Sequence, residues 1–178
     1  NWYNETFGKD AVAVYSATRK FSRAFKAFPF SLDLLYNGPQ NVGAANLLYE
    51  KPTGLSATMV GYPFDDLKKW RGPFGEKEFI GQFGKLASEW GKACKFLRGV
   101  SNERAKEVAQ MAEAVYIHFY STYLQARFIT VREQPFAAAE IKKIIAAERE
   151  NTVKMLKLQS ENSAIGYEAS NQYFYYKN

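Results

Sequence analysis

The chain of 178 residues has the length of one domain. Hydrophobic residues make up 47% of it and aromatic residues 16%, which is enough for a buried core and for aromatic side chains at an interface. No apolar run approaches the length of a membrane span, and no secretory signal is visible. We therefore predict a single domain, residues 1–178, without a membrane partner.

The net charge of +6 is spread along the sequence. Residues 1–60 carry 6 basic and 4 acidic side chains, residues 61–100 carry 8 and 5, and residues 101–178 carry 10 and 9. Proteins that bind nucleic acids concentrate their positive charge on one patch. This distribution is typical of a solvated surface and argues against a nucleic-acid partner.

The sequence contains one cysteine, Cys94, and one histidine, His118. A single cysteine cannot form an internal disulfide, and its place on an apolar helix face favours a buried hydrophobic role over a nucleophilic one. These two residues do not make a Cys/His metal site. A glycine-rich phosphate loop, a nucleophile elbow and a zinc-protease motif are also missing from the sequence. We therefore assign no metal and no cofactor.

Four segments have the apolar spacing of amphipathic helices. The predicted long helices are residues 10–28, 76–98, 101–133 and 136–159. Asp10 and Ser101 are suited to cap the first and third of them, while Pro29 and Gly99 are typical of helix ends. The predicted fold is all-α, an irregular bundle of about four long helices with a long ordered crossover between the first and the second.

The crossover, residues 30–62, holds most of the turn-forming sequence. A connection of this length is uncommon in a compact domain and is usually functional or disordered, and its apolar residues argue against disorder. Side-chain amides beside an Asn-Gly-Pro turn can bind a sugar hydroxyl or a carboxylate, or can satisfy the loop's own backbone. The amides concerned are those of Asn37, Gln40, Asn41 and Asn46. For this cluster both interpretations stay open.

A short helix is predicted at residues 64–71. Asp65 lies near its N-terminus, where a carboxylate suits the helix dipole. Asp65 and Asp66 are adjacent and diverge on a helix, so a cap and a surface charge are favoured over a pair of catalytic carboxylates. Trp70 and Arg71 are placed to line a pocket, although a tryptophan in a loop-rich region more often covers the core.

Polar residues interrupt the apolar face of the third long helix. His118, Thr122 and Gln125, the polar seam, share a face with Val115 and Ile129, and buried polar groups need partners or water. One interpretation is a ligand site between the polar seam and the crossover. The other, which is favoured, is a hydrogen-bond network that fastens the crossover to the helices. Both interpretations predict that the crossover contacts this helix.

Glu148 lies on the apolar stripe of the fourth long helix. The sequence leaves open whether its carboxylate pairs with Arg127, pairs with Arg132 or extends to solvent. A glycosidase needs two carboxylates about 5–10 Å apart, and no two acidic residues of this chain are paired by spacing. We therefore assign no catalytic residue.

Three stretches carry a resemblance to a known family: LYNGPQNVGAANLLYEKPTGLSATMVGYPFDDLKKWRGPF, HFYSTYLQARF and GYEASNQYFYY. They resemble the C-terminal helical region of large bacterial proteins that are similar to glycoside hydrolases. The resemblance implies that the chain is a fragment, a helical domain that packs on an upstream catalytic domain of the same polypeptide. It also implies a carbohydrate ligand and a periplasmic or secreted location.

Two functions follow as hypotheses. The first is a non-catalytic domain of a carbohydrate-active enzyme, which predicts an exposed aromatic patch that could also join two copies into a homodimer. The second is a self-contained module that binds a small ligand between the crossover and the polar seam. The candidate ligand-binding residues are Asn37, Gln40, Asn41, Asp65, Trp70, Arg71, His118 and Gln125.

Overall fold

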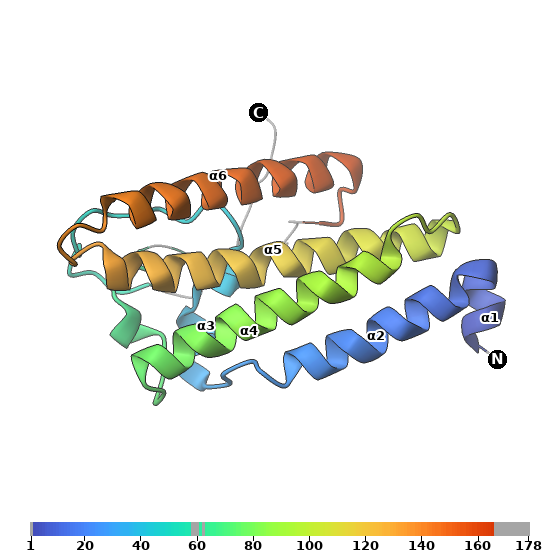
Figure 1. The fold of residues 1–178 in the computed structure, drawn as a ribbon, viewed down its shortest axis with the longest axis horizontal. Coiled ribbons are helices and arrows are strands. Elements are labelled where there is room, and N and C mark those ends of the chain that lie inside the picture. The colour runs from blue at the N-terminus through green and yellow to red at the C-terminus, as the bar shows by residue number, and fades with distance from the viewer. Residues whose placement is uncertain (1, 58–60, 62, 166–178) are drawn as a thin grey trace.

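The computed structural model describes residues 2–57, 61 and 63–165, and every regular element in this part of the chain is a helix. The long helices are α2 (Ala11–Phe25), α4 (Glu76–Cys94), α5 (Glu103–Val131) and α6 (Ala138–Glu161), as Figure 1 shows. The short α-helices are α1 (Trp2–Phe7) and α3 (Leu32–Asn37). The short 3-10 helices are η1 (Gly8–Asp10), η2 (Pro39–Asn41), η3 (Leu67–Lys69) and η4 (Lys95–Leu97). The all-α prediction with four long helices is confirmed.

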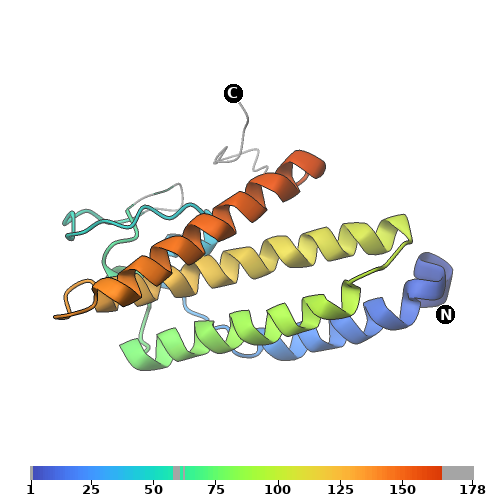
Figure 2. The same ribbon diagram turned by 45° about the horizontal axis from the view of Figure 1, so that its top comes forward.

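The long helices form a row in which each packs on the next. α2 packs on α4, α4 on α5, and α5 on α6. Figures 1 and 2 show α6 on one side of α5 and the α2–α4 pair on the other. The main core lies around α4, where Phe79, Phe83 and Leu86 are completely buried. The crossover between α2 and α4 places η2 against the side of α5.

Two glycines allow α4 and α5 to approach each other closely. Gly84 faces the ring of Tyr123 and Gly91 faces the ring of Tyr116. A Cβ atom at Gly91 would lie 2.8 Å from the ring of Tyr116, too close for a real side chain. The rings of Tyr116, Tyr120 and Tyr123 stack on one another along α5. Glycine at these two positions therefore sets the spacing between the two helices.

The start of α5 differs from the prediction. Ser101 is not its cap, because Asn102 takes that position and accepts a hydrogen bond from the N–H of Ala105 at 3.2 Å. Asp10 makes no side-chain cap on α2. Its carboxylate instead accepts the N–H groups of Asn102 and Ser101, both at 2.8 Å, and these bonds lower the pKa of Asp10. Asp10 thus fastens the start of α2 to the start of α5.

We expect Phe83→Ala to lower the free energy of unfolding by about 3–5 kcal/mol, because the substitution leaves a cavity in the core between α4 and its neighbours. Urea denaturation measures the change. The matched control is Phe136→Ala, at a fully exposed ring, for which we expect a change of no more than about 0.5 kcal/mol. Similar losses at the two positions would contradict the placement of the core.

Candidate functional site

The polar seam of α5 contacts the crossover, as both interpretations of the sequence predict. His118 Nδ1 lies 2.9 Å from the carbonyl oxygen of Gln40, and Gln125 Nε2 donates to the carbonyl oxygen of Phe64 at 2.7 Å. Thr122 instead donates to the carbonyl of His118 within the same helix. A carbonyl oxygen only accepts, so Nδ1 of His118 carries the proton. The seam therefore fastens the crossover to α5 at Gln40 and the segment that follows the crossover to α5 at Phe64.

The carboxylate of Glu148 in α6 joins the crossover to both α5 and α6. Glu148 is 4% exposed. Its Oε1 accepts the N–H groups of Ala45 and Asn46, each at 3.0 Å, and the hydroxyl of Ser121 at 2.6 Å. The amide of Asn46 donates to the Ser121 oxygen at 2.7 Å. One buried oxygen thus collects hydrogen bonds from two backbone groups of the crossover and one side chain of α5.

The backbone at this contact has an unusual conformation. Ala45 has a φ of 79°, in the left-handed region that residues other than glycine rarely adopt. Such a conformation costs free energy and persists only where the surroundings determine it. The hydrogen bonds that Glu148 accepts from Ala45 and Asn46 hold Ala45 in this conformation.

Burial shifts the pKa of two groups in this network in opposite senses. Desolvation raises the pKa of the Glu148 carboxyl, while the hydrogen bonds from Ser121 and from the Asn46 and Ala45 backbones act against the shift. Desolvation lowers the pKa of His118, and the bond to the Gln40 carbonyl acts against that shift. Burial thus favours the neutral form of each side chain.

The two arginines considered as partners of the Glu148 carboxylate bind other groups. Arg127 pairs with Glu140 at 2.9 Å. Arg132 donates to the carbonyl oxygens of Tyr49 and Asp65, at 3.1 and 2.8 Å. All three expectations for Glu148, an Arg127 pair, an Arg132 pair and exposure to solvent, are therefore wrong.

The amides beside the Asn-Gly-Pro turn bind the backbone of their own loop. Gln40 Nε2 donates to the carbonyl of Leu34 at 2.6 Å, and Asn41 Nδ2 donates to the carbonyl of Leu35 at 2.7 Å. Both acceptors belong to α3, and each lies six residues before its amide. Asn37, the last residue of α3, is half-buried.

The remaining candidates lie between the crossover and α4. Asp65 lies directly before the N-cap of the short helix η3, and Asp66 is the residue that caps it. The carboxylate of Asp65 is buried and accepts the N–H of Thr53. Trp70 is 1% exposed and packs in the main core, while Arg71 is half-buried beside it. Asp65, Trp70 and Arg71 therefore lie further along the chain than Gln40 and take no part in its contact with His118.

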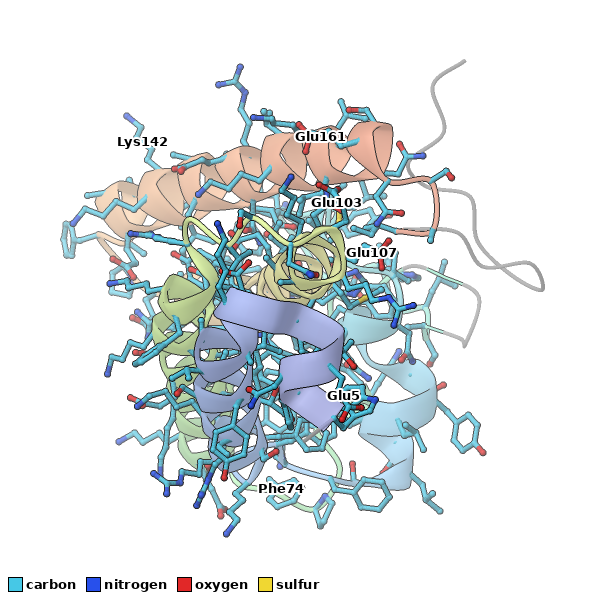
Figure 3. All side chains as sticks on the ribbon, turned by 90° about the vertical axis from the view of Figure 1, so that its right-hand side faces the viewer. Glu5, Phe74, Glu103, Glu107, Lys142 and Glu161 are labelled. Atoms are coloured by element: carbon cyan, nitrogen blue, oxygen red, sulfur yellow. The ribbon has the colours of Figure 1, made fainter. Side chains whose placement is uncertain are left out.

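An apolar groove opens on the side of the molecule where α2 and α5 face each other. Both helices pack on α4, and they meet each other where the ring centroids of Phe25 and Phe119 lie 6.3 Å apart. The apolar groove has a volume of about 650 Å³, and its apolar lining includes Trp2 and Phe7 of α1, Phe21 of α2, Trp90 of α4, and Met111 and Val115 of α5. In Figure 3, the view onto the α1 end, α5 lies between α6 and α1.

The described part of the chain contains neither a three-residue metal site nor a helix suited to span a membrane. No group of three His, Cys, Asp or Glu side chains there is arranged to hold a metal ion. No helix within the same residues is sufficiently long and apolar to cross a membrane.

Comparisons of the chain with protein-family models, with curated proteins and with solved structures find no match. The resemblance to the helical region of glycoside-hydrolase-like proteins therefore stays an expectation. Its third stretch, residues 166–176, also lies outside the described residues.

We expect Glu148→Ala to lower the free energy of unfolding by about 2–4 kcal/mol, because Ala45, Asn46 and Ser121 lose their buried acceptor. Glu148→Gln keeps an acceptor oxygen and should cost less. A raised pKa in the folded state means that the stability gained from the wild-type carboxyl is fully present below about pH 4.3 and is lost as the pH rises through the folded-state pKa.

Urea denaturation over a range of pH tests both statements about Glu148. The advantage of the wild type over Glu148→Gln should shrink as the pH rises above about 4.3. Equal losses for the alanine and glutamine variants, independent of pH, would show that the carboxylate does not hold the crossover.

We expect His118→Ala to lower the melting temperature at pH 7.5, because the Gln40 carbonyl loses its donor. A lowered histidine pKa makes the folded state less stable as the pH falls below about 6.5, where the unfolded chain takes up the proton. The difference between the wild type and the variant should therefore shrink towards pH 5.5. Asn37→Ala is the control and should leave the domain folded, whereas an unchanged melting temperature for His118→Ala would rule out a structural polar seam.

Proposed function

We propose that the chain is a non-catalytic helical docking domain whose apolar groove receives one amphipathic helix of a partner protein. The supporting observation is the open side of the helix row. α2 and α5 both pack on α4 and meet at the Phe25–Phe119 ring contact, whereas towards α1 the groove between them is open, so its apolar side chains occupy the place where a bundle would hold a further helix. Apolar faces of helices are normally buried in this way.

The length of the apolar groove suits a helix. Along α5 its lining extends from Arg104 to Val115, and a helical segment of that length spans about 16 Å, or about three turns. Three turns accommodate apolar anchors at positions i, i+3 or i+4, and i+7 of a bound helix, which is the usual pattern for a helix in a groove.

The interior of the apolar groove favours apolar contacts over a polar ligand. The indole N–H of Trp90 is already donated to the carbonyl of Ala112 at 2.9 Å. The ring of Phe21 stacks on Trp90 with 4.5 Å between the ring centroids. The charged side chains of the lining, Arg104 and Glu107, belong to the first two turns of α5. A leucine-rich helix face fits these surroundings, whereas a sugar would lack hydrogen-bond partners on the aromatic floor.

The charge of α2 defines the partner further. α2 carries Arg19, Lys20 and Arg23 and contains no acidic residue. Opposite charges across an interface guide association and select the partner. None of these three side chains lines the apolar groove, so their charge attracts the partner at a distance, and the docking helix should carry an acidic flank.

The resemblance to glycoside-hydrolase-like proteins would place this helix in the catalytic domain of the same polypeptide. A second apolar surface supports a wide contact, because Phe25, Phe30, Leu32 and Tyr36 are exposed near the loop of the Asn-Gly-Pro turn. A carbohydrate at that loop would have to displace the side-chain amides from the α3 carbonyl oxygens. Sugar binding is therefore not part of the proposal.

The test uses a synthetic amphipathic helix of about 14 residues, with leucine at the anchor positions and glutamate on one flank. The peptide is titrated into the protein while the tryptophan fluorescence of the protein is recorded. We expect saturable binding to the wild type. Met111→Glu, at a side chain that is 51% exposed, should weaken binding by about tenfold or more, because the anchors then meet a charge.

The matched control is Ile145→Glu, at a 47% exposed side chain of α6, and it should bind the peptide like the wild type. Both positions are exposed, so neither substitution opens a core cavity. Equal binding by the two variants, or the lack of saturable binding by the wild type, would refute the docking proposal.

A further inference from the structure

The segments of α2 and α4, together with the residues that directly follow each helix, carry the charge excess of the whole chain. Residues 11–26 contain four basic and no acidic side chains, and residues 76–98 contain five basic and three acidic ones. Nine basic against three acidic residues is an excess of six, which equals the net charge of +6. The two segments are far apart in the sequence but pack side by side (Figure 1). The fold therefore gathers a charge that is spread along the sequence.

A cleft between α2 and α4 brings several of these cations together. This cationic cleft has a volume of about 350 Å³ and is lined mainly by Lys20 and Arg23 of α2, Lys85, Glu89 and Lys92 of α4, and Phe96 of η4. Glu89 is bonded to Lys92 at 2.6 Å, which neutralises one of the four cations. The other three form no ion pair with any residue that the structure describes.

Two of the unpaired cations, Lys20 and Lys85, act together with Lys92 on the carboxylate of Glu89. The pKa of Glu89 is lowered first by Lys92 and further by Lys20 and Lys85, so the fields of all three ammonium groups reach its carboxylate. The ammonium of Lys20 lies 4.8 Å from the ring centroid of Phe96, a cation–π contact that places it at the wall of the cleft. Clefts lined by charges of one sign concentrate the field and attract ions of the opposite sign.

We propose that the cationic cleft binds a phosphate-bearing small molecule, with Lys20, Arg23 and Lys85 around the phosphate and Phe96 against its carbon skeleton. A phosphomonoester carries a charge of about −1.5 to −2 at neutral pH, so it offsets more of the three unpaired cations than a single carboxylate does. The arginine offers a planar fork to the phosphate oxygens, and the lysines act as point charges. The volume is that of a small-molecule site.

The site lies outside the apolar groove and is independent of the docking proposal. Phe21 and Met111 line the apolar groove but not the cationic cleft. Met111→Glu should therefore leave phosphate binding unchanged.

Isothermal titration with inorganic pyrophosphate, at low and at physiological salt, tests the proposal. We expect saturable binding of one pyrophosphate per chain, weaker at higher salt. The double variant Lys20→Ser/Lys85→Ser should weaken binding by about tenfold or more. Both lysines are exposed, so the variant is expected to fold, and its melting curve verifies this.

The matched control is Lys142→Ser/Lys143→Ser, which removes the same charge from exposed positions of α6. Figure 3 shows Lys142 on α6, across the molecule from α2. The affinity of this control variant for pyrophosphate should equal that of the wild type. Equal weakening in both double variants would reveal a general charge effect and overturn the proposal, as would a lack of saturable binding. Binding to vesicles that contain phosphatidylglycerol, without binding to pyrophosphate, would also overturn it.

Discussion

The buried carboxylate of Glu148 is the contact on which the arrangement of the crossover depends. Through one oxygen it joins α6 to Ser121 of α5 and to the backbone of Ala45 and Asn46. Without Glu148, the backbone N–H of Asn46 and the hydroxyl proton of Ser121 would lose their buried acceptor, which costs more than the bonds themselves contribute. The burial that raises the pKa of Glu148 also makes these bonds strong, because the local dielectric is low. The long crossover thus depends on an acceptor that lies outside it, on α6.

The four long helices could be predicted from the sequence because their apolar residues repeat at helical spacing. Their ends could not, because capping depends on which side chain reaches which backbone group. Asp10 stands where a cap of α2 is expected, but its carboxylate reaches the start of α5, about ninety residues further along the chain. The short helix α1 was missed, because six residues are too few to show a period.

The candidate site could be predicted only in part, for the same reason. The polar seam on α5 indicated contact with the crossover, and that contact is present at His118, while Gln125 binds Phe64 just after the crossover. The partners of Glu148 could not be found, because its contact with Asn46 joins residues 102 positions apart. A usable signal existed in α6, where Glu148 and Asn151 lie three residues apart on a largely apolar stripe and are both buried. Charge counts in consecutive windows likewise missed the α2–α4 pair, since its members come from different windows.

The arrangement of the helices in a row has a consequence for local opening. α4 and α5 each pack on two long helices, whereas α2 packs chiefly on α4 and reaches α5 through the Phe25–Phe119 ring contact and the Asp10 carboxylate. The unit of α1 and α2 can therefore separate at a lower free energy than α4 or α5. That unit forms a wall of the apolar groove and a wall of the cationic cleft. A ligand bound in either proposed site would favour the attached state of α2, so the two sites would be thermodynamically coupled although they share no lining residue.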